Sequence, residues 1–390
     1  MKMLTTLAAL VSMLLASMVA VAEGPTVYGR VAFGLTSESG EEDEDDKDRL
    51  EDFLGSRLGV KGTNDLGNGM TVDYLLEYGA GESMSLRHSN LTLNGSFGQF
   101  RLGKQTGVLY RYIGANIDQS WGVGGKSYYQ IAKTSTNSNH GLRMSNIAAY
   151  RFGAGPGGDD PITFDIQIQS VDQSTKDAVV LKELPASSGD LQFTADNFTV
   201  TEAADDDESI DSVTIGAATA LGPVKFQVAY VDENGSDATG DRSPSLLSFG
   251  FRAPLGSAEI RGHMTEVDAD TDMRGDDEAW GLLVMNDFGG GYFGMIGVGN
   301  YEDGAQEVVN AGADGDINAT DDNFVETHGD AGDLTDAYVS LTKSFGGGLS
   351  AIAEYRTVSK TKSTVGTADT PANDDKEKMN TFLVSLLQSF

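Results

Sequence analysis

The chain has 390 residues, of which 49 are glycine and 8 are proline, and it has no cysteine. Disulfide scaffolds, thiolate chemistry and thiolate metal sites are therefore excluded. The formal net charge of −32 argues strongly against nucleic-acid binding, because a polyanion would be repelled. Beyond the N-terminus no long apolar run occurs, so we expect no transmembrane helix, although membrane-crossing strands hide their apolar residues at every second position.

Residues 1–22 have the features of a secretory signal peptide. Lys2 gives a basic start, an apolar stretch runs from Leu4 to Val21, and Ala20-Val21-Ala22 is a small-x-small cleavage site. A membrane anchor is the alternative, but serines interrupt the run and no positive stop-transfer flank follows it. We expect cleavage after Ala22, export from the cytoplasm, and a mature chain of residues 23–390 that forms one domain.

Apolar and polar residues alternate along the segments that follow. Between Val27 and Leu35 the odd positions are apolar or glycine, whereas the even positions include Tyr28 and Arg30. Strand side chains point alternately to two faces, so one face can meet lipid while the other lines water. A charge on the lipid face would cost about 2–4 kcal/mol at mid-membrane. The same sorting recurs in three further segments, around Arg57 and Lys61, from Val72 to Tyr78, and from Phe382 to Phe390.

Alternation alone would also fit a soluble β-sandwich, but the lengths of the connections favour a membrane barrel. Short turns on one side and long loops on the other are typical of outer-membrane barrels, with the turns periplasmic and the loops outside. The short connections lie at Thr63–Gly69, Ser96–Gly98, Leu221–Pro223, Pro254–Gly256, Phe288–Gly291 and Phe345–Gly348. The long polar connections are Ser37–Asp52, Thr106–Arg143, Asp172–Glu208, Glu302–Asp333 and Lys360–Lys378.

The segments between these connections predict an all-β fold, a 16-stranded antiparallel transmembrane β-barrel. An even number of strands closes the sheet and leaves no unpaired edge in lipid. Sixteen strands also leave an aqueous channel instead of a filled core. The predicted strands start near Thr26, Phe53, Met70, Ser85, Gln99, Met144, Pro161, Ser209, Val224, Ser243, Ser257, Asp277, Tyr292, Leu334, Leu349 and Met379.

The opening third of the chain and its last residue resemble the Gram-negative trimeric general porins. The matching stretches are Val27–Arg30, Ser56–Gly62, Asp65–Gly69, Gly95–Gln105 and the terminal Phe390. The resemblance implies a third loop folded into the pore, opposite a ladder of basic side chains on the wall. It also implies a homotrimer that associates through the first and last strands, and recognition of Phe390 by the barrel-assembly machinery.

Carried over by position, the basic wall of the pore constriction would consist of Arg30, Arg57, Lys104 and Arg151. Arg30 and Arg57 lie on the face opposite the apolar stripe, and so does Arg151 if Ala148, Tyr150 and Phe152 point outward. Lys104 shares the parity of Phe100 and Leu102, so an inward Lys104 requires a β-bulge.

The constriction loop would span about residues 106–143, the longest connection. The family usually presents several carboxylates there, but this chain has only Asp118, against Arg111, Lys126, Lys133 and Arg143. A basic ring favours anions by the same physics that makes an acidic ring favour cations. The narrowest point is therefore expected to prefer anions weakly. Aromatic residues in this loop include Trp121.

Acidic runs occur in the outer loops, such as Glu41–Asp46 and Asp205–Glu208. They would concentrate cations at the mouth, but only within a Debye length of about 8–10 Å. Acidic runs are commonly solvated surface, suited here to a salty medium or to contact with lipopolysaccharide bridged by divalent ions. Selectivity is therefore expected to be set where the pore is narrow.

Other motifs point to neither a metal nor a catalytic site. Asp268-x-Asp270-x-Asp272 and Asp314-x-Asp316-x-Asn318 resemble calcium loops, but they lack the glycine and the closing glutamate that such loops need. No pair of histidines has metal spacing. His88 and Ser89 are adjacent in sequence, so on a strand their side chains point to opposite faces. We expect no enzyme activity, no metal and no cofactor.

Together these features predict a porin of the Gram-negative outer membrane, exported through the periplasm, that passes small hydrophilic solutes and ions by passive diffusion. Its expected partners are outer-membrane lipid, lipopolysaccharide and the assembly machinery. One alternative is a substrate-specific, sugar-type porin, since Tyr110, Tyr112, Trp121, Tyr128 and Tyr129 could stack on sugar faces. A structural or adhesive surface barrel is the other alternative.

Overall fold

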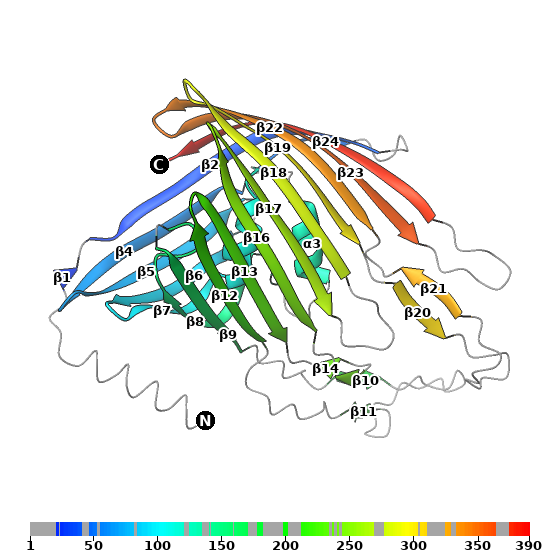
Figure 1. The fold of residues 1–390 in the computed structure, drawn as a ribbon, viewed down its shortest axis with the longest axis horizontal. Helices are drawn as coiled ribbons and strands as arrows, with labels where there is room; N and C mark the ends of the chain where they lie inside the picture. Colours follow the sequence, from blue (N-terminus) through cyan, green and yellow to red (C-terminus); the bar gives the residue numbers. More distant parts are fainter. Residues whose placement is uncertain are drawn as a thin grey trace, which may run out of the picture.

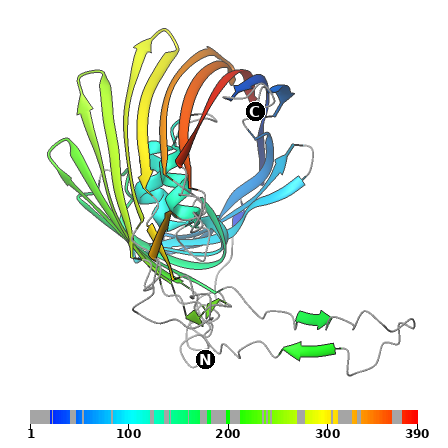
Figure 2. The same ribbon diagram turned by 90° about the vertical axis from the view of Figure 1, so that its right-hand side faces the viewer.

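In the computed structural model the chain folds into a closed antiparallel β-barrel, seen from the side in Figure 1 and along its lumen in Figure 2. The structure describes residues 21–22, 24–40, 47–52, 55–81, 84–120, 125–134, 140, 142–158, 160–170, 178–181, 198–201, 212–233, 236–237, 240–241, 244–268, 277–302, 305–309, 324–328, 333–363 and 374–390.

Sixteen strands form the barrel, as predicted, and each pairs with its neighbours in the chain order of the barrel. The last strand pairs with the first, from Arg30 opposite Ser389 to Ser39 opposite Asn380, and this pairing closes the sheet. The barrel strands are β2 (Thr26–Ser39), β4 (Arg57–Gly67), β5 (Met70–Ala80), β6 (Met84–Gly95), β7 (Gly98–Thr106), β8 (Arg143–Phe152), β9 (Ile162–Gln169), β12 (Ser212–Leu221), β13 (Val224–Glu233), β16 (Ser245–Leu255), β17 (Ala258–Asp268), β18 (Asp277–Gly289), β19 (Tyr292–Glu302), β22 (Leu334–Gly346), β23 (Leu349–Ser363) and β24 (Asp374–Ser389).

Further short strands are added to this barrel. β3 (Lys47–Glu51) pairs with the part of β2 that β4 leaves free, and β1 (Val21–Ala22) pairs with β4. The remaining short strands form hairpins at the end of the barrel where the long connections lie (Figure 1). They are β10 (Ala178–Leu181), β11 (Phe198–Thr201), β14 (Ser236–Asp237), β15 (Gly240–Asp241), β20 (Ala305–Val309) and β21 (Phe324–His328).

The alternation in the sequence becomes the two faces of the barrel wall. On β2, Phe33 is 57% exposed while Ala32 is 1% exposed, and on β24 Leu386 is 60% exposed while Ser385 is buried. Exposed apolar side chains on the outside are what lipid contact requires, because burial in hydrocarbon replaces burial in a protein core. No helix among the described residues is long and apolar enough to cross a membrane.

The third loop, between β7 and β8, folds into the barrel, as predicted from the family (Figure 2). It contains the π-helix η2 (Tyr110–Gly114), the short helix α2 (Ala115–Ile117) and the helix α3 (Lys126–Thr134). Their buried apolar side chains pack on the inner wall of the later strands, and these contacts form the largest apolar cluster of the described residues. The cluster includes Val108, Leu109, Tyr112, Ile113, Tyr128, Ile131, Ala229, Val231, Leu246, Val267 and Tyr301.

A glycine permits this packing. A Cβ at Gly114 would lie 2.5 Å from the Tyr128 ring. Only glycine at this position therefore lets Tyr128 of α3 approach the backbone of η2 so closely. The described helices of the third loop thereby pack together on one side of the barrel wall. The early strands lie on the opposite side of the barrel (Figure 2).

Two connections differ from the sequence-based prediction. The connection from β8 to β9 is not among the predicted short turns; it lies at the short-turn end, where the Pro156 carbonyl accepts a hydrogen bond from Gln227 of β13. The last long connection is shorter than Lys360–Lys378, because Lys360 pairs with Glu377 and β24 begins at Asp374. The predicted strand starts at Phe53, Ser209 and Ser243, and residues 1–20 of the expected signal peptide, lie outside the described residues.

Candidate pore constriction

A cavity of about 770 Å³ lies between the third loop and the wall of the early strands. The wall contributes Arg30, Arg57, Arg87 and Arg143, and the loop contributes Tyr110, Asp118, Gln119, Lys126 and Tyr129. We call this the constriction cavity. Met285, Phe293, Met295 and Thr342 add an apolar side from the later strands.

Four strands on one side of the barrel, β2, β4, β6 and β8, supply the arginines. Arg30 lies on β2, Arg57 begins β4, Arg87 lies on β6 and Arg143 begins β8. Arg87 faces the lumen because the β5–β6 pairing shifts register after Glu77, leaving Arg87 as the extra residue of a bulge. Bulges re-aim a side chain in this way near functional sites. The four guanidinium groups therefore form one basic arc.

Glu77 lies behind this arc and holds part of it in place. Its carboxylate accepts a hydrogen bond from Arg87 Nε at 2.7 Å and one from the Tyr28 hydroxyl at 2.9 Å, and Arg57 Nε lies 3.6 Å away. Glu77 is 4% exposed and does not line the cavity. One buried carboxylate thus offsets part of the charge of two arginines and restricts their side-chain rotamers.

Asp118 faces the arc from the loop side and is held by two tyrosines. Tyr110 donates its hydroxyl hydrogen bond to Asp118 Oδ2 at 2.6 Å, and Tyr129 donates to the same oxygen. Burial and the neighbouring carboxylate raise the pKa of both phenols well above the usual value. Both hydroxyls therefore stay protonated and remain donors at any physiological pH.

The charges that line the constriction cavity are unequal. Arg30, Arg57, Arg87, Lys126 and Arg143 are cationic, and Asp118 is the acid that lines it. Even with Glu77 counted behind the arc, positive charge is in excess. Such an arrangement attracts anions into the narrow part of a water-filled channel.

The structure places the four basic residues predicted for the wall in different ways. Arg30 and Arg57 line the constriction cavity. Arg151 points inward but lies nearer the short turns, where its Nε–H contacts Asp165 at 3.0 Å. Lys104 pairs with Ser89, on the face that also carries the exposed Leu91 and Leu102, and it does not line the cavity. The required bulge does occur beside Gly103, but it leaves Gln105, not Lys104, on the inner face.

The residues predicted for the constriction loop also separate. Asp118 and Lys126 line the cavity, whereas Arg111 is almost buried beneath the loop, 3.7 Å from Asp165. Lys133 belongs to α3, and its side chain lies outside the described part, as does all of Trp121. Phe390 pairs with Gly29 through two backbone hydrogen bonds of 3.0 and 3.1 Å, and its side chain is exposed.

Arg87 is a functional candidate that the sequence-based prediction omits, whereas Arg143 is predicted as a basic residue of the constriction loop; the structure places both on wall strands that line the cavity. The sequence signal for Arg143 is its position directly before an alternating segment. For Arg87, simple alternation could not place the side chain, because the bulge interrupts the period of two. Among the described residues no group of three or more histidine, aspartate or glutamate side chains could hold a metal ion.

Comparisons with known proteins agree with this geometry. A family model described as Gram-negative porin matches residues 6–305. The chain belongs to the Gram-negative porin family. No curated protein sequence matches this porin.

Solved structures share the fold of this porin. OmpF of Salmonella typhi, in complex with daunomycin, has 13% identity and a TM-score of 0.61, covering 95% of this chain and 100% of its own. The trimer form of OmpT, an outer membrane protein of Vibrio cholerae, has 15% identity and a TM-score of 0.59, with 94% and 100% covered. The outer membrane channel DcaP of Acinetobacter baumannii has 14% identity and a TM-score of 0.57, with 95% and 97% covered.

Family membership and fold confirm two further predictions, the function and the localisation. The porin is an outer-membrane protein of a Gram-negative bacterium, and it is a channel for passive diffusion.

Proposed function

We propose that this porin passes small hydrophilic solutes and ions through the constriction cavity, with a weak preference for anions. The observation that carries the proposal is the charge of the cavity lining, where four arginines and Lys126 face Asp118. Transport is passive, so it needs no cofactor and includes no covalent step.

The path follows from the arrangement of the barrel. Solutes enter at the end with the long loops, pass between the basic arc and the third loop, and leave at the short-turn end. The acidic outer loops affect ions only within about 8–10 Å at moderate salt, so the narrow cavity dominates selectivity. Screening is weakest there, because little water separates a passing ion from the guanidinium groups.

We further propose that the mature porin starts at Glu23 and works as a homotrimer in contact with lipopolysaccharide. A trimer form is described for the Vibrio cholerae OmpT structure, which has the same fold. Phe390, proposed as the assembly signal, has an exposed side chain at the seam where β24 meets β2. Because the ring of Phe390 is exposed at this seam, the assembly machinery could contact it there.

A sugar-type porin is the second candidate, and the burial of the aromatic residues weakens it. Tyr112 and Tyr128 are fully buried against the wall, so they cannot stack on a solute. Tyr110 and Tyr129 line the cavity, but their hydroxyls are committed to Asp118. The tyrosines therefore fit the role of shaping and anchoring the loop better than that of a sugar slide.

The test is the reversal potential of the purified porin in a planar bilayer under a KCl gradient. Conductance with a reversal potential on the anion side is expected. A reversal potential on the cation side would contradict the proposed charge preference, and folded protein without conductance would contradict the channel itself. Saturable block of the current by a sugar would favour the second candidate.

A further inference from the structure

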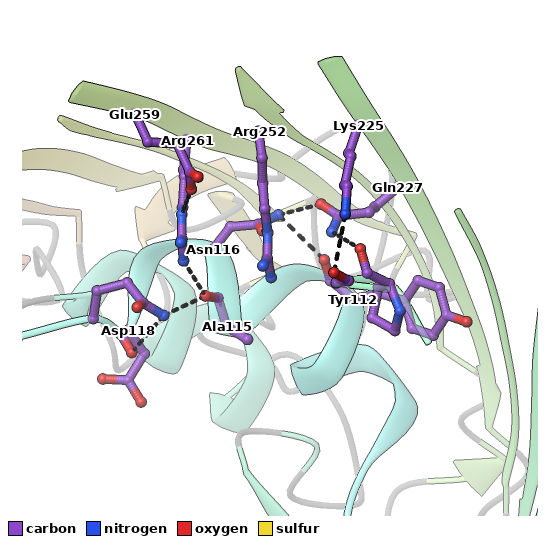
Figure 3. Close-up of polar contacts among 12 residues, drawn as sticks. Tyr112, Ala115, Asn116, Asp118, Lys225, Gln227, Arg252, Glu259 and Arg261 are labelled. Atoms are coloured by element: carbon purple, nitrogen blue, oxygen red, sulfur yellow. Dashed lines mark hydrogen bonds and ion pairs between the residues drawn. The ribbon is translucent and has the colours of Figure 1, made fainter. Parts of the chain in front are cut away.

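Three cations stand in one row on the opposite wall from the basic arc. Lys225 of β13 is paired with Arg252 of β16, and Arg252 is paired with Arg261 of β17. We call these three residues the basic row. Figure 3 shows their side chains extending from the strands toward the third loop. Like charges directly opposite each other on neighbouring strands are destabilising, so the row calls for an explanation beyond the fold.

The basic row lies between the third loop and the short-turn end of the barrel. Lys225 follows the turn at residues 222–223, and Arg252 comes shortly before the turn at residues 256–257. The third loop packs farther along the same strands, on Ala229 and Leu246. A solute that has passed the constriction cavity would therefore meet the row before it leaves the barrel.

Most partners of the basic row are uncharged. Arg261 donates to the Ala115 carbonyl at 3.4 Å, Arg252 Nε donates to Asn116 Oδ1 at 2.6 Å, and Lys225 donates to the Gly157 and Gly158 carbonyls at 2.9 and 2.7 Å. Glu259 pairs with Arg261. Lys225 and Arg252 form no ion pair among the described residues, so the row keeps excess positive charge.

Anchoring of the third loop does not account for this charge. Gln227 is neutral and contacts the same elements, accepting from Asn116 Nδ2 at 2.7 Å and donating to the Pro156 carbonyl at 3.3 Å. A neutral donor could therefore hold both the loop and the turn. In addition, the two Nη groups of Arg252 have no hydrogen-bond partner among the described residues and are reached by solvent.

We propose that the basic row is a second anion-binding station, which takes a compact oxyanion such as phosphate, sulfate or the carboxylate of an organic acid. The free Nη groups of Arg252 form its contact, since a guanidinium edge matches two oxygens of such an anion. Lys225 and Arg261 add attraction from either side. This inference rests on the proposed function, because it needs a water-filled path past the third loop.

With the basic row, this porin would attract anions at two successive positions along its lumen. An anion leaves the arc on the β2–β8 side of the lumen and is received by the row on the β13–β17 side. Two sites of moderate affinity in series allow faster passage of an anion than one strong site. Each site must bind the anion well enough to attract it and weakly enough to release it.

The experiment compares the full-length mature porin with variants in planar bilayers, at constant KCl and with rising inorganic phosphate added to either side. The double variant K225Q/R252Q removes the excess charge and can still donate hydrogen bonds. We expect the apparent affinity of phosphate, read from the reduction of chloride current, to fall roughly three- to tenfold. The reversal potential should also move toward cations. R252K retains the charge but lacks the planar guanidinium edge, so its apparent phosphate affinity should lie between those of the double variant and wild type.

The control N116S removes the contact between the loop and Arg252 but leaves every charge of the row. It should behave as wild type in phosphate. The inference is overturned if K225Q/R252Q responds to phosphate as wild type does, or if N116S reproduces its loss, which would assign the row to loop anchoring. If the double variant does not fold, the single variants K225Q and R252Q give the same readout. If the wild-type porin does not conduct, the proposed function itself is overturned. If the wild-type porin conducts but the double variant responds to phosphate as wild type does, only the proposal for the basic row is overturned.

Discussion

The hydroxyl of Tyr110 donates a hydrogen bond of 2.6 Å to Oδ2 of Asp118, at the point where the third loop faces the basic arc. Tyr129 of α3 donates a hydrogen bond to the same oxygen. One carboxylate thereby ties η2 to α3 across a part of the loop that includes residues 121–124. Asp118 is therefore both the negative charge that faces the basic arc and the hydrogen-bond acceptor that links η2 to α3.

Replacing both tyrosines in Y110F/Y129F should loosen this joint. A phenylalanine keeps the ring packing but donates no hydrogen bond, so Asp118 loses two donors and the loop gains freedom. We expect more current noise at unchanged charge, measured in single-channel recordings. Y150F is a matched control, because Tyr150 bonds to the Phe97 carbonyl away from the cavity. Equal noise in the double variant and in wild type would contradict a joint at Asp118.

Removing the charge of Asp118 in D118N should strengthen the anion preference. The arc would then face no carboxylate across the cavity, and we expect the anion-to-cation permeability ratio to rise about two- to threefold. The reversal potential in a KCl gradient measures it. D287N removes the same charge at an exposed short turn and should have no effect. A shift toward cations in D118N would show that another acid controls the pore.

Glu77 should matter for both charge and stability. In E77Q, Arg57 and Arg87 lose their carboxylate partner, so the cavity becomes more positive and the barrel wall loses about 1–3 kcal/mol. We expect a larger anion preference and a lower temperature of unfolding in heat-modifiability gels. E38Q serves as the comparison, because Glu38 pairs at 2.6 Å with Arg49, which is exposed, and such pairs contribute about 0–1 kcal/mol. Similar losses in both variants would contradict the role given to Glu77.

Gly29 should be required for closing the barrel at its seam. A Cβ there would lie 2.6 Å from the Arg57 carbonyl oxygen and 2.7 Å from the Phe390 ring. G29A should therefore reduce the yield of folded, heat-modifiable barrel. In contrast, a Cβ at Gly24 meets nothing within 4 Å, so G24A should fold as wild type. Normal folding of G29A would mean that the terminal ring can move aside without cost.

Much of the fold could be predicted from the sequence because the signal is local. Alternation with a period of two assigns Phe33 to the outside and Arg30 to the inside without knowledge of any neighbour. The same rule predicted the inward Arg57 and the sixteen barrel strands. It failed where the period is interrupted, as at Arg87, and it did not show that the connection after β8 contacts Gln227 of β13.

The candidate site depended on the tertiary structure for most of its members. Which strands meet, and in which register, is decided by pairing across the whole barrel, and this pairing brings Lys225, Arg252 and Arg261 into one row. The position of Asp118 depends on how the third loop packs against strands far away in the chain. The sequence by itself determined which side chains can face water, because that is a property of each strand alone. Only the closed barrel decided which of them face each other, because that requires the long-range contacts that close the sheet and bury the loop.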